Sequence, residues 1–455
     1  MTVSVVLFTS DLRLHDNPVL RAALHDAESV VPLFVHDDGV RGTGFAVPNR
    51  RAFLADCLAD LDAGLRKRGG RLVVRSGDVA DQVREVVAAT GAARVHVAGG
   101  VSRYALRREE RLRGALAATG CELVTHDAVI TAVTPGELLP SGGSRVDHYA
   151  VFTPYFRRWT AAGVRDFLAA PRKVPVAEVA SEPLLPRTEI SGVSPGVDAG
   201  GESAGRERLR AWLAGGVDGY EDGHDDLAAD VTSRLSPHLH FGTLSAAEII
   251  HGANREGSSG ARAFIRQLAW RDFHHQVLAA RPETADQDYR PRGDRWRTDG
   301  EEVAAWREGR TGYPFVDAAM RQLRHEGWMH NRGRMVVASF LTKTLYTDWR
   351  VGARHFLSLL VDGDIANNQL NWQWAAGTGT DTRPNRVLNP VVQGKRFDPG
   401  GRYVRRWVPE LAGVEDRYIH EPWRLQGPDR GGIDYPDPIV DLAEGRARFE
   451  RARGA

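Results

Sequence analysis

The chain has 455 residues and a formal net charge of +1 at neutral pH, and its composition is that of a globular protein of two or three domains. No run approaches the roughly 18 unbroken apolar residues that span a bilayer, and the first apolar run, residues 3–8, is too short for a signal peptide. With only Cys57 and Cys121, neither a disulfide framework nor a cysteine metal site is expected, so we expect a protein of the cytoplasm.

Short apolar segments alternate with amphipathic stretches over residues 1–130. One helix is expected to open at Asn17-Pro18, where a capping side chain precedes proline, and another to run from about Arg50 to Arg68. The expected strands are residues 4–8, 30–35, 71–74, 94–97 and 122–124. This spacing predicts a parallel, doubly wound sheet with right-handed crossovers. Residues 9–13, after the first strand, lack a GxGxxG turn, so no ordinary dinucleotide site is expected there.

The rest of the chain is expected to form a connector and a helical domain. Residues 131–205 are interpreted as an inter-domain linker, because residues 171–205 are rich in Pro, Gly, Ser and Val. Residues 206–455 are expected to be all-α, with helices that include residues 246–250, 261–278, 315–326 and 331–345. The predicted fold class is therefore an α/β domain (1–130), a long linker and an all-α domain (206–455).

Polar side chains in the helical half suggest a ligand pocket. Residues 232–237 place three hydroxyls and a guanidinium before a helix, which suits a phosphate, although a helix cap with a surface arginine would look the same. Asn331, Arg334 and Met335 fall at i, i+3 and i+4 on one helix face. A partly buried helix with one long arginine would also show this pattern. Asp362 and Asp364 do not fit an EF-hand loop and are better interpreted as partners of Arg334.

Basic and tryptophan residues are concentrated in the second half of the chain. Seven basic residues and one acid lie between Arg383 and Arg406, which is either a solvated face or a phosphate-binding rim. Nine of the eleven tryptophans lie from Trp270 onward, which suits core packing but also stacking or electron transfer.

Five motifs spread over the chain carry a family resemblance. They are residues 8–18 (FTSDLRLHDNP), 151–154 (VFTP), 270–273 (WRDF), 312–321 (GYPFVDAAMR) and 421–423 (EPW). On these motifs the chain resembles the photolyase/cryptochrome family, and most closely its microbial class I photolyases for cyclobutane pyrimidine dimers. The resemblance implies light-driven DNA repair, in which excited, reduced FAD passes an electron to a dimer flipped out of UV-damaged DNA. It implies a monomer that uses no metal.

The resemblance also gives roles to individual positions. The residues implied for FAD binding are Tyr220, Thr232, Ser233, Arg234, Leu235, Ser236, Arg271, Asn331, Arg334, Asp362, Gly363, Asp364 and Asn368. Asn368 is expected to face flavin N5. The residues implied for DNA contact are Gln267, Trp270, Arg332, Met335, Trp374 and Gln393. Trp270 and Trp374 are expected to wedge against the flipped dimer, Gln267, Arg332 and Met335 to contact the lesion, and Gln393 to contact the DNA backbone. Gln267, Asn331, Met335 and Asn368 are the expected catalytic residues. Trp296, Trp349 and Trp372 are implied as an electron relay from the surface to the flavin.

Three departures from the family pattern bear on the function. Gln267 stands where a glutamate is typical of dimer photolyases, and glutamine there is more typical of (6–4) photolyases and animal cryptochromes; Asn331 and Met335 favour dimer repair. The 380–389 loop is one residue short, with Arg386 in a region where aromatics are common. Ala98-Gly99-Gly100 disfavours a methenyltetrahydrofolate antenna and leaves 8-hydroxy-5-deazaflavin as the expected second chromophore.

Three alternatives to dimer repair remain at this stage. A (6–4) photolyase would share the pocket, and a blue-light signalling cryptochrome would replace repair by a protein partner. A flavin oxidoreductase working in the dark has little support, because no nicotinamide fingerprint is present.

Overall fold

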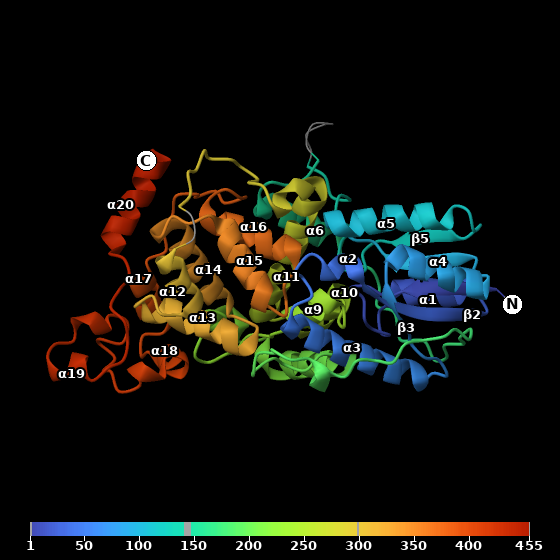
Figure 1. Cartoon of the computed structure of the whole chain (residues 1–455), viewed down its shortest axis with the longest axis horizontal. Coiled ribbons are helices and arrows are strands. Elements are labelled where there is room, and N and C mark those ends of the chain that lie inside the picture. The colour runs from blue at the N-terminus through green and yellow to red at the C-terminus, as the bar shows by residue number, and fades with distance from the viewer. Residues whose placement is uncertain (1, 141–146, 298–299, 455) are drawn as a thin grey trace.

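The computed structural model describes residues 2–140, 147–297 and 300–454. An α/β part built on the N-terminal sheet occupies one end of the molecule, and helices make up the rest (Figure 1). The C-terminal helix α20 (Leu442–Arg453) lies at the end opposite the sheet. Among the described residues, none of the helices has the length and apolar character needed to cross a membrane.

The sheet has five parallel strands in the order β3-β2-β1-β4-β5. The strands are β1 (Val3–Leu7), β2 (Ser29–Asp37), β3 (Val73–Gly77), β4 (Arg94–Ala98) and β5 (Glu122–His126). In register, Val5 of β1 lies opposite Val31 of β2 and Val95 of β4. All five residues of β1 are buried, since helices cover both faces of the sheet. The five predicted strands and the doubly wound fold class are confirmed.

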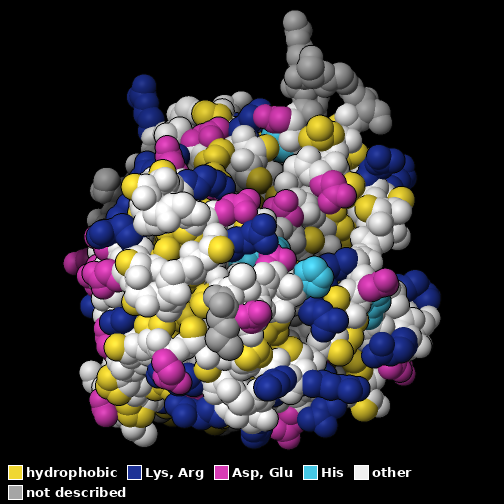
Figure 2. All heavy atoms as spheres, turned by 90° about the vertical axis from the view of Figure 1, so that its right-hand side faces the viewer, with side chains coloured by type: hydrophobic (Ala, Val, Ile, Leu, Met, Phe, Trp, Pro, Cys, Tyr) yellow, Lys and Arg dark blue, Asp and Glu magenta, His cyan; other side chains and the backbone are white. Residues whose placement is uncertain are grey.

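The helices of the α/β part lie on both faces of the sheet. They are α1 (Pro18–Asp26), α2 (Asp38–Arg41), α3 (Pro48–Arg66), α4 (Val79–Thr90) and α5 (Arg103–Leu116). Asn17 caps α1 as predicted: its Oδ1 accepts a hydrogen bond from Leu20 N at 3.0 Å. Val6 packs with α1 and α3, whereas Val5 and Leu7 pack with α4 and α5 on the other face. Figure 2 shows that both acidic and basic side chains lie on this end of the molecule.

The predicted linker contains a helix, α6 (Phe152–Ala162), that packs against the helical part. The Phe152 ring stacks on Trp270 with centroids 3.7 Å apart, and Trp159 Nε1 donates to Asp272 at 3.0 Å. Farther along, the chain runs beside the α/β part, where Val174 N donates to the carbonyl oxygen of Arg68 at 2.9 Å. The proposed division at residues 130 and 205 stays a prediction, but the linker is packed on both sides.

The second half is helical, and the described residues contain no strand after β5. Its first helices are α7 (Glu202–Ala211), α8 (Tyr220–Gly223), α9 (Ser236–Phe241), α10 (Ala246–Glu256), α11 (Ser259–Ala280) and α12 (Glu301–Glu308). They are followed by α13 (Pro314–Glu326), α14 (Asn331–Ser339), α15 (Trp349–Leu359), α16 (Ile365–Ala376), α17 (Pro390–Phe397), α18 (Arg402–Trp407) and α19 (Pro428–Gly431). The four helices predicted from periodicity are confirmed, and the stretch predicted as one helix over 331–345 is α14 followed by a π-helical turn, Phe340–Thr344.

Candidate functional site

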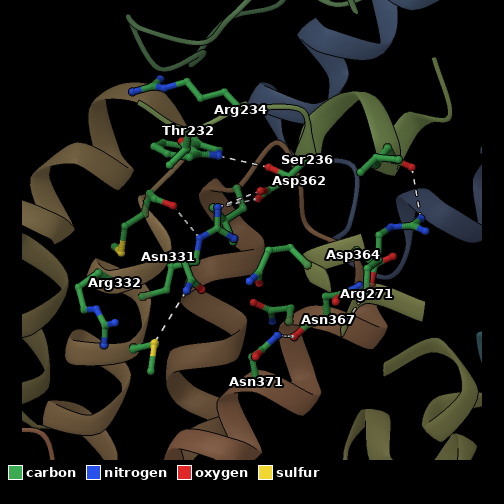
Figure 3. A pocket seen from close by; sticks show the side chains of 18 of the residues that line it. Thr232, Arg234, Ser236, Arg271, Asn331, Arg332, Asp362, Asp364, Asn367 and Asn371 are labelled. Carbon is green, nitrogen blue, oxygen red and sulfur yellow. Dashed lines mark hydrogen bonds and ion pairs between the residues drawn. The ribbon is translucent and has the colours of Figure 1, made fainter. Parts of the chain in front are cut away.

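One cavity of about 370 Å³ lies among α9, α11, α14 and α16 in the helical part. This volume is within the range of cofactor sites. Figure 3 shows its polar side chains pointing inward from helices that are distant in sequence. Of the residues expected to bind FAD, the lining includes Tyr220, residues 232–236, Arg271, Asn331, Arg334, Asp362, Asp364 and Asn368, and only Gly363 is absent from it.

The 232–236 segment presents hydroxyl groups to the cavity at the start of α9. Ser236 Oγ accepts from Trp328 Nε1 at 3.2 Å, while Thr232 Oγ1 is buried and has no partner among the described residues. Arg234 adopts a left-handed backbone (φ 50°), and its guanidinium lies over the Trp328 ring and pairs with Glu326 at 3.1 Å. A buried hydroxyl without a partner costs free energy unless a ligand bonds it, so the segment suits a polar ligand such as the phosphates of FAD.

Arg334 and Asp362 form an ion pair in the wall of the cavity, as the sequence predicts. Arg334 Nη2 lies 2.9 Å from Asp362 Oδ2, and its Nε donates to the carbonyl oxygen of Met329 at 2.8 Å. Asn331 Nδ2 lies 3.8 Å from Met335 Sδ, so the predicted shared face of α14 is confirmed.

Asp364 is held ionised at the start of α16. Its Oδ1 accepts from Asn367 N at 2.7 Å, and its Oδ2 lies 3.2 Å from His275 Nε2. Burial opposes the charge, but His275 and Arg271 outweigh it and hold the pKa of Asp364 well below its ordinary value. The site therefore keeps a fixed negative charge able to accept hydrogen bonds from a sugar-like chain.

Asn368 is buried with its amide nitrogen fully used. Asn368 Nδ2 donates one hydrogen bond to the carbonyl oxygen of Ala353 at 3.2 Å and another to Gln369 Oε1 at 2.8 Å. The side chain lines the cavity, and no hydrogen bond from another of the described residues reaches its amide oxygen, which is therefore available there as an acceptor.

The residues expected to contact the damaged DNA lie only partly in this cavity. Gln267, Arg332, Met335 and Trp374 line it together with Asn331, and Gln267 and Asn331 are exposed. Trp270 and Gln393 are outside the lining. The Trp270 ring is stacked on Phe152, and Gln393 lies on α17.

The basic run of residues 383–406 is largely neutralised by acids from elsewhere in the chain. Arg402, Arg405 and Arg406 pair with Asp226, Asp416 and Glu326, and Lys395 pairs with Glu421. Arg332, one of the expected DNA contacts, pairs with Asp225 at 2.6 Å. Arg386 lies over the Trp374 ring, 5.6 Å from its centroid. The local charge available to phosphates is therefore smaller than the sequence indicates.

The three tryptophans expected to form a relay run from the cavity toward the surface. Trp372 lines the cavity and Trp349 is fully buried, with Nε1 donating to Asp288 at 2.8 Å, whereas Trp296 is half-exposed. Gly352, one turn after Trp349 in α15, allows the Trp372 ring to lie against the helix: a β-carbon there would be 2.2 Å from Trp372 Cη2. Arg297 N donates to the carbonyl oxygen of Tyr346 at 2.9 Å, which fixes the Trp296 segment beside the segment before α15.

Several cavity residues were not identified from the sequence. They include His240, Trp328, Asn367 and Asn371. Asn367 and Asn371 are one turn apart on α16, and their i, i+4 spacing beside Asn368 is a signal that could have found them. Burial lowers the pKa of His240 to about 4, so its ring is neutral in the cavity wall.

Two family models match the chain, a DNA photolyase model over residues 4–176 and the FAD binding domain of DNA photolyase over residues 264–454. A deoxyribodipyrimidine photo-lyase of Streptomyces griseus is 70% identical over 455 residues, which is all of both chains. A bacterial class III photolyase structure from Agrobacterium tumefaciens superposes with a TM-score of 0.91 at 34% identity, covering 100% of this chain and 97% of that one. A cryptochrome structure from Synechocystis gives 0.90 at 30% identity, with 99% of each chain covered. The chain therefore belongs to the DNA photolyase family and contains its FAD-binding domain.

Proposed function

We propose that the protein is a deoxyribodipyrimidine photo-lyase that uses light to reopen cyclobutane pyrimidine dimers in DNA. The observation that carries the proposal is that the polar residues suited to binding FAD and the side chains suited to contacting the lesion line one cavity. The 70% identity to the Streptomyces photo-lyase over the full length supports it. Class I membership remains part of the proposal, since similar structures include a class III photolyase.

The proposed FAD ligands divide by chemistry. Residues 232–236 hold the phosphates, Asp362 with Arg334 and Asp364 with Arg271 hold the polar chain, and Tyr220 closes one side. When bound in its reduced form, FAD supplies one electron to the dimer under blue light and receives it back after the ring has opened. The protein supplies orientation and a dry site.

Asn368 is positioned to favour the reduced flavin. Because Nδ2 is already bonded to Ala353 and Gln369, the amide presents its oxygen to the cavity. Because the Asn368 oxygen can only accept a hydrogen bond, it favours a flavin whose N5 carries a proton. An unprotonated N5 would face it with a second acceptor. The protein thus stabilises the form of the cofactor that repair requires.

The lesion is proposed to enter at the exposed side of the cavity. Trp374 is half-exposed there and can stack on a flipped base, a contact worth roughly 1–3 kcal/mol. Gln267 of α11 can both donate hydrogen bonds to the pyrimidine edges and accept them. Met335 and Asn331 of α14 line the same cavity. Trp270 is proposed to flank the flipped dimer with Trp374, Arg332 to contact the lesion, and Gln393 to contact the DNA backbone.

The test is repair of defined oligonucleotides by the purified, reduced holoprotein. One oligonucleotide carries a cyclobutane dimer and another a (6–4) photoproduct, and each is incubated in the dark and under blue light. We expect loss of the cyclobutane dimer in light only. Repair of the (6–4) photoproduct alone would establish that rival activity, and no change in either would favour the signalling role of a cryptochrome.

A second chromophore is also proposed, in the α/β part. 8-Hydroxy-5-deazaflavin is favoured over methenyltetrahydrofolate because Ala98-Gly99-Gly100, at the end of β4, offers no polar side chain. The absorption spectrum and mass of the chromophores released by denaturation identify it, and a folate in the extract would overturn the assignment. We further propose that the protein acts on DNA in the cytoplasm as a monomer. Light scattering of the holoprotein, alone and bound to DNA, tests whether it is a monomer.

A further inference from the structure

Trp372, Trp349 and Trp296 are called the tryptophan row below. Four side chains make up its outer end, at Trp296. Trp296 packs against Tyr346 with ring centroids 4.9 Å apart and planes tilted by 41°. Tyr346 Oη donates to Asp294 Oδ1 at 2.9 Å, and Asp294 pairs with Arg453 of the C-terminal helix α20 at 2.6 Å. Three distant parts of the chain therefore meet around one tyrosine.

Tyr346 is held in this position with a strained backbone. Its backbone is in the left-handed region (φ 54°), which a bulky residue adopts only where the surroundings impose it. The ring is 4% exposed, whereas the neighbouring Trp296 is half-exposed. Backbone strain at a residue whose ring contacts an expected redox residue points to a function for the tyrosine itself.

Asp294 is suited to receive a proton from Tyr346. Its side chain is 1% exposed, and Oδ2 is buried without a hydrogen-bond partner among the described residues. Arg453 balances its charge and also donates to the carbonyl oxygen of Ala376 at 2.9 Å. The guanidinium lies 5.8 Å from the Trp296 centroid, but the carboxylate beside it offsets its repulsion of a positive charge on that ring.

We propose that Tyr346 is the terminal electron donor of the tryptophan row and that Asp294 accepts its proton. The inference rests on the proposed function, in which light draws an electron inward and leaves Trp296 as a radical cation. Trp296 then takes one electron from Tyr346, while the phenolic proton moves along the existing hydrogen bond to Asp294 Oδ1. The products are neutral Trp296, a neutral Tyr346 radical and a protonated Asp294.

The proton transfer makes the charge separation last longer. In the resting state, burial and the bond to Asp294 raise the pKa of Tyr346 to about 12, so the phenol keeps its proton. Once an electron has left, the phenol becomes a strong acid and Asp294 is already in place to take the proton. Return of the electron then requires return of the proton as well, which slows recombination.

The experiment follows radicals in the holoprotein with oxidised flavin after a laser flash, by transient absorption and electron paramagnetic resonance. In the unmodified protein we expect a tryptophan radical that gives way to a tyrosyl radical, more slowly in D₂O than in H₂O. Tyr346→Phe keeps the ring and should lose the tyrosyl signal, leaving the tryptophan radical. Tyr418→Phe is the matched control, since Tyr418 is half-buried and none of the described ring contacts joins it to a tryptophan, and it should keep the signal.

Asp294→Asn separates the proton acceptor from the packing role. The amide oxygen still accepts a hydrogen bond from Tyr346 but cannot take up its proton, so the tyrosyl signal should be lost although the ring stays in place. An unchanged tyrosyl signal in Tyr346→Phe, or decay of the tryptophan radical without a tyrosyl radical in the unmodified protein, would overturn the proposal.

A second measurement distinguishes this inference from the proposed function. Protein reduced chemically with dithionite needs no relay, so its repair of a cyclobutane dimer under light tests the proposed function alone. Repair without a tyrosyl radical would defeat only the role of Tyr346. Failure of repair would defeat the proposed function, and failure of the flash to bleach the oxidised flavin would defeat the inference, because Trp296 would not be oxidised.

Discussion

Gly352 is the position where a single methyl group should do the most damage to the row of tryptophans. It lies inside α15, and a β-carbon there would be 2.2 Å from Cη2 of Trp372 and 2.7 Å from Cδ2 of Leu341. Trp372 is 2% exposed, and its ring packs edge-on against Phe356 and Trp306, so a displaced ring would lose these contacts and enter the cavity that it lines. Helix propensity alone would make alanine about 1 kcal/mol more favourable than glycine. Overpacking a filled core typically costs about 1–3 kcal/mol and occasionally more, and contacts this short place Gly352→Ala at the upper end.

We therefore expect Gly352→Ala to lower the free energy of unfolding by about 1–2 kcal/mol after the propensity gain is included. Gly114→Ala is the matched control, because Gly114 is also inside a helix, α5, and a β-carbon there would meet nothing within 4 Å. That variant should be more stable than the unmodified protein by up to about 1 kcal/mol. Urea unfolding followed by far-ultraviolet circular dichroism measures both. Equal stabilisation by the two substitutions would refute the packing argument, and slower flavin photoreduction in Gly352→Ala is expected alongside.

Three further outcomes are expected. Asp362→Asn leaves Arg334 without its ionic partner in the cavity wall and should reduce FAD retention, measured as the ratio of flavin to protein absorbance after gel filtration; unchanged retention would contradict the role of the pair. Burial lowers the pKa of His330 to about 4, so its neutral ring contributes stability that is present above about pH 6.5 and is lost as pH falls toward 4. His330→Asn keeps an acceptor for Arg332 N and should therefore flatten the decline of the urea midpoint between about pH 6.5 and 4. An equally steep decline in this variant would reject the role of His330 in the pH dependence. Gln267→Glu should leave flavin content unchanged, since Gln267 is exposed at the mouth of the cavity, and should retain repair of the cyclobutane dimer; a loss of flavin would show that Gln267 supports the cofactor.

The local rules of sequence predicted the elements that depend on nearby residues. The cap at Asn17, the alternation of strands and helices, and the shared face of Asn331 and Met335 all follow from spacing within a few residues. The pair of Arg334 with Asp362 spans 28 residues and was still expected, because Asp362 and Asp364 do not fit an EF-hand loop and Arg334 lies on the predicted polar face of its helix.

The electrostatics of the DNA-facing side could not be predicted in this way. Arg402 meets Asp226 and Arg332 meets Asp225, across separations of 176 and 107 residues. A charge run shows only its own neighbours in sequence, whereas folding brings in carboxylates from the α8–α9 region. The same reason explains Trp270, whose stack on Phe152 joins the predicted linker to α11 and leaves the ring outside the cavity lining.

Two buried or half-buried carboxylates lie along the row of Trp372, Trp349 and Trp296. Asp288 accepts from Trp349 Nε1, and Asp294 lies beyond Trp296 at the Tyr346 hydroxyl. A positive charge on an indole is stabilised by a nearby carboxylate, and more strongly in a buried site than in water. Arg350 stacks on Trp349 but pairs with both Asp288 and Asp348, so its own charge is compensated. Asp288 therefore favours a positive charge on Trp349, and the proposed proton transfer from Tyr346 to Asp294 would hold the electron vacancy at the Trp296 end.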